Sequence, residues 1–139
     1  SSVQVANQEV GRIGAGLLVF LGIAEDDTPE DLGYLVSKVI NLRTFEDADG
    51  KMNLSIRDVS GEMLVISQFT LLADCRRGRR PSFTGAARPE MAQAFYNDFI
   101  SQVKKYDLPV ASGIFQAEME VFIVNDGPVT FLLDSRRLF

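Results

Sequence analysis

Histidine and tryptophan are absent from this sequence, and cysteine occurs once. Without histidine, neither a Ser-His-Asp or Cys-His mechanism nor a histidine-ligated metal site is possible, and one cysteine cannot form a thiolate-rich zinc site. Any proton transfer must therefore use carboxylates, lysine, water or a group on the substrate. We expect neither a metal nor another cofactor.

A long apolar run and a positive net charge are also lacking. No apolar stretch approaches the ~20 residues that span a bilayer, and the first residues show no signal-peptide pattern. Cys75 has no partner for an internal disulfide, which is typical of a reducing compartment. We therefore expect a cytoplasmic protein that does not contact membranes. The net charge of -5 argues against a generally basic, nucleic-acid-coating protein but leaves room for a local basic patch.

Short apolar runs alternate with turn residues along the chain. Val3 to Val5 and Glu9 to Ile13 flank Ala6-Asn7-Gln8, which predicts a hairpin with Asn7 in the turn. Leu17 to Ile23 is a continuous apolar run, which is typical of a strand covered on both faces. Further strands are expected at residues 52–56, 63–66, 119–124 and 129–133.

Two amphipathic stretches predict helices. Thr28 is a candidate N-cap with Pro29 at the first helical position, and apolar residues at helical spacing continue to a helix end near Arg43. Pro89 opens a second helix, whose apolar face contains Met91, Phe95, Phe99 and Val103. With 139 residues we expect one α/β domain of mostly antiparallel strands, with the two helices packed against them.

Polar side chains follow the apolar run at 63–66. Ser67, Gln68 and Thr70 place three hydrogen-bonding groups there, with Phe69 between them. Such groups at strand ends commonly line binding sites. The alternative is a strand leaving the core, with Thr70 present for its β propensity. A nucleophilic Thr70 would need an adjacent base, and no histidine can supply it.

Asn125-Asp126-Gly127-Pro128 is a strong turn signal. One interpretation is a tight turn between two strands. The other is that backbone groups at Gly127 and Pro128 face a ligand, because glycine permits close approach.

Four arginines lie within five positions of a polar loop at residues 72–84. They could neutralise phosphates, or they could be solvated or paired with acids of a partner. Phe83 could stack on a base or anchor the loop. The four loop arginines are Arg76, Arg77, Arg79 and Arg80.

The carboxylates at Asp26-Asp27 and at 46–49 match no calcium loop and are interpreted as solvated turns. Arg136-Arg137 is interpreted as a solvated tail.

Five segments together resemble the D-aminoacyl-tRNA deacylase family. They are GLLVFLGIAEDD (Gly16 to Asp27), NLRTFEDADGKMNLS (Asn41 to Ser55), VISQFTL (Val65 to Leu71), GRRPSF (Gly78 to Phe83) and VNDGPVT (Val124 to Thr130). Their common order and spacing make the resemblance specific, and it spans nearly all of the chain. It implies a single, barrel-like deacylase domain over residues 1–139.

The resemblance implies a homodimeric cytoplasmic hydrolase. Such enzymes cleave the ester between a D-amino acid and the terminal adenosine of tRNA, and they remove glycine from mischarged tRNA. The family site combines the SQFT segment with a cis Gly-Pro peptide. Carried over, the catalytic set is Ser67, Gln68, Phe69 and Thr70. The substrate-binding set is Gly127, Pro128, Phe83, Met119 and Asn125, and Arg76, Arg77, Arg79 and Arg80 are expected to bind tRNA.

In the family, the Gly-Pro loop of one subunit reaches into the pocket of the other. The main-chain oxygens of Gly127 and Pro128 would then face the amino acid, and an L side chain would collide there. A proposed family mechanism activates water with the 2′-hydroxyl of the terminal ribose, while backbone amides near Phe69 and Thr70 stabilise the oxyanion. This route needs no histidine. An older proposal makes Thr70 the nucleophile.

The family domain normally begins with a further strand ahead of Ser1, which contains a Gln-Arg pair. This sequence starts after it, so the arginine thought to orient the Gly-Pro loop has no counterpart here. Two other functions stay open. A non-catalytic RNA- or nucleotide-binding module would use the arginine loop, and a small-molecule esterase would act independently of tRNA.

Overall fold

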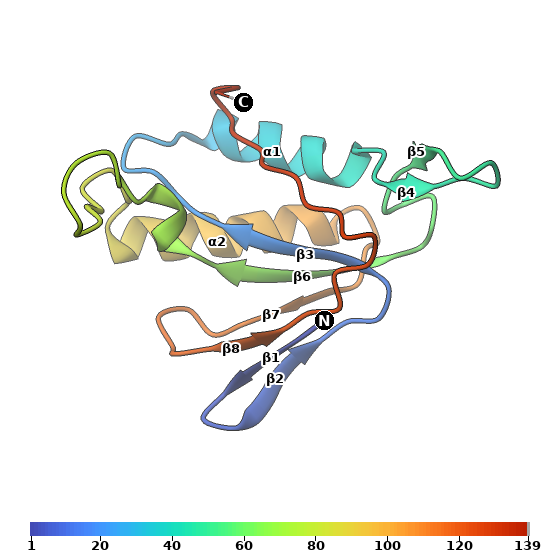
Figure 1. The fold of residues 1–139 in the computed structure, drawn as a ribbon, viewed down its shortest axis with the longest axis horizontal. Coiled ribbons are helices and arrows are strands. Elements are labelled where there is room, and N and C mark those ends of the chain that lie inside the picture. Colours follow the sequence, from blue (N-terminus) through green and yellow to red (C-terminus); the bar gives the residue numbers. More distant parts are fainter. Residues whose placement is uncertain (139) are drawn as a thin grey trace.

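The central sheet is built from the two main apolar runs of the sequence. β3 (Gly16–Leu21) lies parallel to β6 (Glu62–Ser67), and β7 (Val110–Ser112) adds a further parallel strand on the other side of β6. The computed structural model describes residues 1–138 (Figure 1). A parallel strand covered on both faces needs apolar side chains on both, which explains why β6 is a continuous rather than an alternating apolar run.

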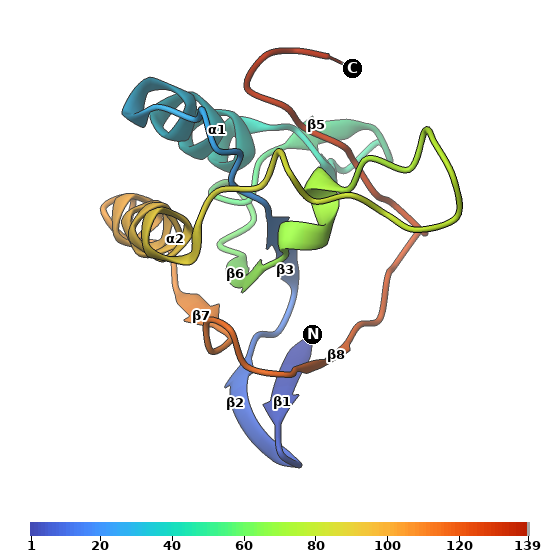
Figure 2. The ribbon, with the colours of Figure 1, turned by 90° about the vertical axis from the view of Figure 1, so that its left-hand side faces the viewer.

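Two helices, α1 (Pro29–Asn41) and α2 (Pro89–Lys104), cover one face of the central sheet (Figure 2). α1 begins as the sequence predicts. The Thr28 hydroxyl accepts from the Asp31 N–H, and the Asp31 carboxylate accepts from the Thr28 N–H at 2.9 Å, which completes a capping box. The helix residues buried against the sheet are Leu32, Val36, Val39, Ile40, Tyr96, Phe99 and Val103.

A second sheet covers the other face of the central sheet. Its antiparallel strands are ordered β2 (Gln8–Arg12), β1 (Ser2–Val5) and β8 (Glu120–Phe122). Leu64 and Ile66 of β6 belong to the cluster that packs against this sheet, whereas the alternate residues of β6 pack against the helices. β6 therefore lies in the middle of three layers, and its carboxyl end is held from both sides.

Two tight turns have the backbone that their residues favour. Ala6 and Asn7, between β1 and β2, both have positive φ (48° and 60°), as a two-residue hairpin turn requires. β4 (Phe45–Glu46) and β5 (Met52–Leu54) form a small antiparallel pair after α1. Gly50 lies between them at φ 71°, where a side chain would be strained.

The expected α/β class is confirmed, with α1 and α2 packed on mixed sheets in the part of the chain described. The outer sheet and the β4–β5 pair are antiparallel, as predicted, but the central sheet is parallel. Parallel neighbours need a long crossover, and the stretch from α1 to β5 provides it between β3 and β6. Neither helix among these residues is long and apolar enough to cross a membrane.

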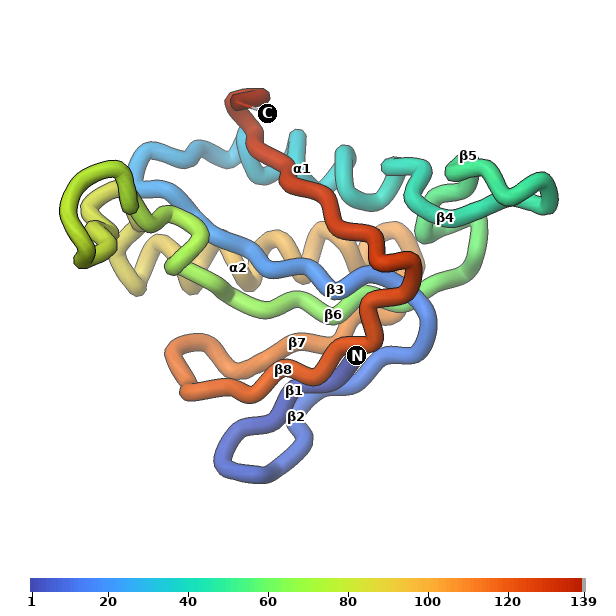
Figure 3. Tube along the Cα trace, in the orientation of Figure 1, coloured from blue at the N-terminus to red at the C-terminus, as the bar shows by residue number. Residues whose placement is uncertain are grey.

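The chain after β8 departs from the prediction. Residues 129–133, expected to be a strand, pair with no strand among residues 1–138, so Gly127-Pro128 does not lie in a turn between two strands. An extended segment forms a strand only where a neighbour presents matching N–H and C=O groups. Here the segment crosses in front of β3 and ends beside α1 (red in Figure 3). Arg136, expected to be solvated, pairs with Asp26.

Candidate active site

The predicted Ser67–Thr70 segment lies where β6 leaves the core. β6 ends at Ser67, close to the strand end expected at residue 66, and the chain then makes a short 3₁₀ turn, η1 (Phe69–Leu72), which the sequence did not predict. The Gln68 N–H donates to the carbonyl of Leu21 at 2.8 Å. This bond fixes the turn to the carboxyl end of β3.

Gly22 allows this close approach, and it was not predicted as a site residue. A Cβ at Gly22 would lie 2.5 Å from the Leu72 side chain and 3.2 Å from the Gln68 carbonyl oxygen. Any larger residue would push η1 away from β3. The sequence signal was a single glycine at the end of an apolar run, which is too common to point to a site.

Thr70 is exposed, and its hydroxyl accepts a 2.5 Å hydrogen bond from Nε2 of Gln68. A side-chain amide is no base, so this contact cannot activate the hydroxyl as a nucleophile. Gln68 therefore orients the Thr70 hydroxyl but does not remove its proton. Ser67 and Gln68 are half-buried beside it.

Two backbone N–H groups in this turn have no acceptor. Within residues 1–138, neither the Phe69 N–H nor the Thr70 N–H makes a backbone or side-chain hydrogen bond. N–H groups at the start of a helical turn lack helical partners. Adjacent free N–H groups at a surface are suited to bind a negatively charged oxygen.

Phe83 is brought back to the site by a short bridge in the arginine loop. Asp74 and Ser82 exchange two backbone hydrogen bonds of 2.7 and 3.0 Å. Phe83 then packs edge-on against Phe69, with ring centroids 5.0 Å apart and planes at 65°. Phe69 is 58% exposed and Phe83 37%. Such accessible aromatic surface next to free N–H groups offers an apolar wall to a ligand.

The four loop arginines are not equivalent. Arg76 makes a bidentate pair with Asp74, with Nε and Nη2 at 2.9 and 2.8 Å from the two carboxylate oxygens. The guanidinium holds the pKa of Asp74 well below its usual value. Arg77, Arg79 and Arg80 are exposed and form no salt bridge within residues 1–138. These three are therefore the arginines available to phosphates.

The Gly127–Pro128 peptide is cis, and Gly127 has φ 117°. The surrounding loop is closed by Asn125, whose Nδ2 donates to Oγ1 of Thr130 at 3.1 Å and whose Oδ1 accepts from the Val129 N–H at 3.4 Å. A Cβ on Gly127 would stand 2.6 Å from Cγ2 of Val129. The loop therefore requires glycine on both steric and backbone grounds.

The fold gathers only part of the predicted site in one place. Phe83 lies against Phe69, and Met119 packs in the cluster that contains Ile66, directly before Ser67. The loop at 125–130 follows β8 and lies at the opposite end of β6 from η1, as the red and green segments of Figures 1 and 3 show. Asn125, Gly127 and Pro128 therefore do not meet the Ser67–Thr70 turn within one chain.

Comparison with known proteins identifies the family of this chain. The family model described as D-Tyr-tRNA(Tyr) deacylase matches residues 1–134. The chain belongs to the D-Tyr-tRNA(Tyr) deacylase family. It is 58% identical over 139 residues to the D-aminoacyl-tRNA deacylase of Syntrophobacter fumaroxidans, covering 100% of this chain and 93% of that protein. Membership confirms the expected resemblance and the expectation of a hydrolase.

Solved structures of deacylase-like fold match as well. The structure named c-Myc DNA Unwinding Element Binding Protein has a TM-score of 0.86 and 42% identity, covering 92% of this chain and 87% of that one. A probable eukaryotic D-amino acid tRNA deacylase, at 18% identity, has a TM-score of 0.71 and covers 86% of each chain, which shows a shared fold alone.

No candidate metal centre is found in the part of the chain that the structure describes. Among residues 1–138, no group of three or more His, Cys, Asp or Glu side chains is arranged to hold a metal ion. The acidic turns instead serve the backbone. Asp47 accepts from the N–H groups of Asp49 and Lys51, and Asp27 accepts from the N–H of Ala24.

Proposed function

We propose that this chain hydrolyses the ester bond of D-aminoacyl-tRNA in the cytoplasm, releasing the free D-amino acid and tRNA, and that it also removes glycine from mischarged tRNA. The observation that carries the proposal is the pair of free N–H groups at Phe69 and Thr70, beside exposed aromatic rings, in a chain of the deacylase family. An ester needs less activation than an amide, so orientation and oxyanion stabilisation can supply the catalysis.

In the proposed mechanism, the aminoacyl ester lies against the Ser67–Thr70 turn. The 2′-hydroxyl of the terminal ribose orients and activates a water molecule, whose oxygen forms the new bond to the carbonyl carbon. The N–H groups of Phe69 and Thr70 stabilise the oxyanion that develops. The carbon–oxygen bond to the ribose then breaks, and the leaving ribose oxygen takes the proton that the water gives up through the 2′-hydroxyl. Gln68 holds the Thr70 hydroxyl aside as part of the pocket wall.

The chiral selection is proposed to come from a second copy of the chain. The Gly127–Pro128 loop and the Ser67–Thr70 turn lie at opposite ends of β6, so the loop does not reach the turn of its own chain (Figure 1). A homodimer allows the loop of one subunit to enter the pocket of the other. The backbone oxygens of Gly127 and Pro128 then stand where an L side chain would project, so that L-amino acids are excluded.

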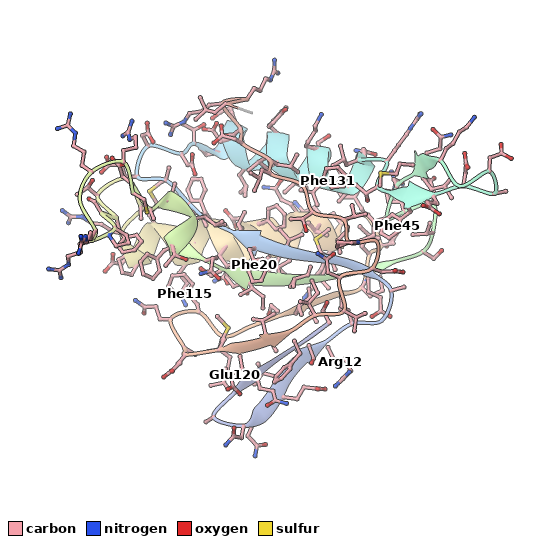
Figure 4. All side chains as sticks on the ribbon, in the orientation of Figure 1. Arg12, Phe20, Phe45, Phe115, Glu120 and Phe131 are labelled. Atoms are coloured by element: carbon pink, nitrogen blue, oxygen red, sulfur yellow. The ribbon has the colours of Figure 1, made fainter. Side chains whose placement is uncertain are left out.

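Exposed apolar side chains support the homodimer. Phe20 of β3 and Phe131 of the C-terminal segment, both labelled in Figure 4, are 43% and 49% exposed, and Leu132 is 68% exposed. Phe20 alternates with core residues of β3 and so faces away from the helices. Exposed apolar patches of this kind mark protein interfaces. Sedimentation is expected to give a dimer for the wild type and monomers for Leu132→Asp.

The arginine loop is proposed to bind tRNA phosphates through Arg77, Arg79 and Arg80. Arg76 contributes less because Asp74 already satisfies it. Phe83 is proposed to line the pocket next to Phe69, and its packing in that pair favours a role as part of the wall. Met119 is proposed to support this part of the pocket through its packing in the cluster that contains Ile66.

The test compares release of tyrosine from D-Tyr-tRNA and L-Tyr-tRNA, with a tRNA ending in 2′-deoxyadenosine as a third substrate. We expect fast release from the D form, little from the L form and little from the deoxy form. Tight, salt-sensitive tRNA binding without release would instead support the nucleic-acid-binding module, a possibility raised by the DNA-binding name of one structural relative. Equal hydrolysis of simple D-amino-acid esters would support the small-molecule esterase.

A further inference from the structure

Residues 123–138, here called the C-terminal segment, carry the Gly127–Pro128 loop but have few ties to the rest of the chain. Within residues 1–138 they make no backbone hydrogen bond to any other element. The bonds of Asn125 to Thr130 and Val129 are internal to the segment. Leu133 is partly buried against the main core. Besides the packing of Leu133, polar contacts at the far end of the segment hold its position.

Those polar contacts lie beside the start of α1. Nη2 of Arg136 pairs with Oδ1 of Asp26 and lies 3.7 Å from Oδ1 of Asp27. The Arg137 guanidinium lies over the ring of Tyr34, 5.4 Å from its centroid. Ser135 lies near the Asp31 carboxylate of the capping box and, after Thr28, helps to lower its pKa.

The acidic partners of Arg136 are themselves fixed. The Asp27 carboxylate accepts from the Ala24 N–H at 2.8 Å, which closes the turn of residues 24–27. The Glu25 N–H donates to the carbonyl of Gly85 at 3.0 Å, and Ala24 and Ala86 form an antiparallel bridge. This turn therefore joins the C-terminal segment to the loop that carries Phe83.

We infer that Arg136, by pairing with Asp26 and Asp27, is a positioning residue for the Gly127–Pro128 loop. The three residues form a latch that fixes one end of the C-terminal segment, while β8 fixes the other end. The inference rests on the proposed role of Gly127–Pro128 in chiral selection. Because Arg136 and Asp26 are exposed, salt screens their pairing. Selectivity between D- and L-aminoacyl-tRNA therefore falls as salt rises. Salt weakens the binding of both substrates alike, and this common effect cancels in the ratio of their hydrolysis rates.

The test replaces Arg136 by Gln in the full chain. We expect the ratio of hydrolysis rates for D-Tyr-tRNA and L-Tyr-tRNA to fall by about two- to fivefold, the range expected from an exposed ion pair. The KM for tRNA stays the same because Arg136 touches no substrate. Limited chymotrypsin cleavage after Leu133, which packs against the core of its own chain while the latch holds, becomes faster by a similar factor. The double exchange Asp26→Arg with Arg136→Asp restores both values, at least in part.

The matched control is Arg12→Gln, which removes another exposed ion pair, with Glu9, on the distant β1–β2 hairpin (Figure 4). It should change neither readout. Wild-type values of both readouts in Arg136→Gln would overturn the latch, and so would faster cleavage with an unchanged D/L ratio. A wild-type enzyme without any D/L preference would instead refute the proposed function. The chymotrypsin cleavage rates of the wild type and Arg136→Gln would then decide whether the latch exists.

Discussion

Replacing Thr70 by Ala separates two mechanisms that the sequence leaves open. The substitution removes the hydroxyl but keeps the backbone N–H of residue 70, the group that we assign to the oxyanion. The side chain is exposed, and its hydrogen bond is the one from Gln68. Little packing is lost, so the effect on the fold should be small.

The two mechanisms differ by orders of magnitude in the expected loss. A neutral hydrogen bond contributes about 0.5–1.5 kcal/mol, so loss of the orienting contact between Gln68 and Thr70 should lower kcat by only about two- to tenfold. Loss of a true nucleophile lowers kcat by about 10⁶-fold, as for the nucleophilic serine of subtilisin. No base contacts the Thr70 hydroxyl in residues 1–138, so we expect the smaller effect.

Single-turnover hydrolysis of D-Tyr-tRNA measures this directly, because it isolates the chemical step from product release. Thr70→Ser, which keeps the hydroxyl, is the matched control. If Thr70→Ala lost more than about 10⁴-fold while it still bound tRNA and kept its thermal stability, the water-based mechanism would be refuted.

Three further predictions concern the scaffold. Tyr96→Phe removes a 2.8 Å bond to a buried carbonyl of β6 and should cost about 1–2 kcal/mol of unfolding free energy in urea titrations; an unchanged midpoint would contradict it. The Thr28 hydroxyl lowers the pKa of Asp31, so this carboxylate stabilises the fold above its unfolded pKa and the effect disappears as pH falls through the lower folded pKa. Asp31→Asn should therefore flatten the acid limb of the thermal-stability curve, and an unaltered limb would argue against the capping box. Gly16→Ala places a Cβ 1.8 Å from the Glu62 carbonyl oxygen and should prevent stable pairing of β3 with β6, as judged by yield of folded protein.

The sequence was most informative where local chemistry decides structure. Thr28 and Pro29 specify the start of α1, and the Asn7 turn specifies the first hairpin, because caps and two-residue turns depend on nearby residues alone. The apolar run at residues 63–66 predicts a buried strand, as β6 is, whereas the run at 17–23 was expected to be covered on both faces and leaves Phe20 exposed. The parallel pairing of β6 was not predicted, since strand direction depends on where α1 returns the chain.

The site was harder to predict because its parts depend on long-range contacts. Ser67 to Thr70 were recognised as polar groups at a strand end, but the free N–H groups arise from the 3₁₀ turn that follows, which no local pattern predicted. Gly22 serves a contact with η1 that no local pattern reveals. Arg136 was interpreted as solvated, since its partners lie 110 and 109 positions earlier, at Asp26 and Asp27.

Chiral selection by the Gly127 loop is most directly tested by one ratio, the rate of hydrolysis of D-Tyr-tRNA divided by that of L-Tyr-tRNA, measured for the wild type and for Gly127→Ala. An added Cβ would stand 2.6 Å from Val129 Cγ2 at a φ of 117°, so the loop must move. We expect a ratio far above one for the wild type and a clear fall in the variant. A wild-type ratio near one, or the same high ratio in both proteins, would contradict this assignment.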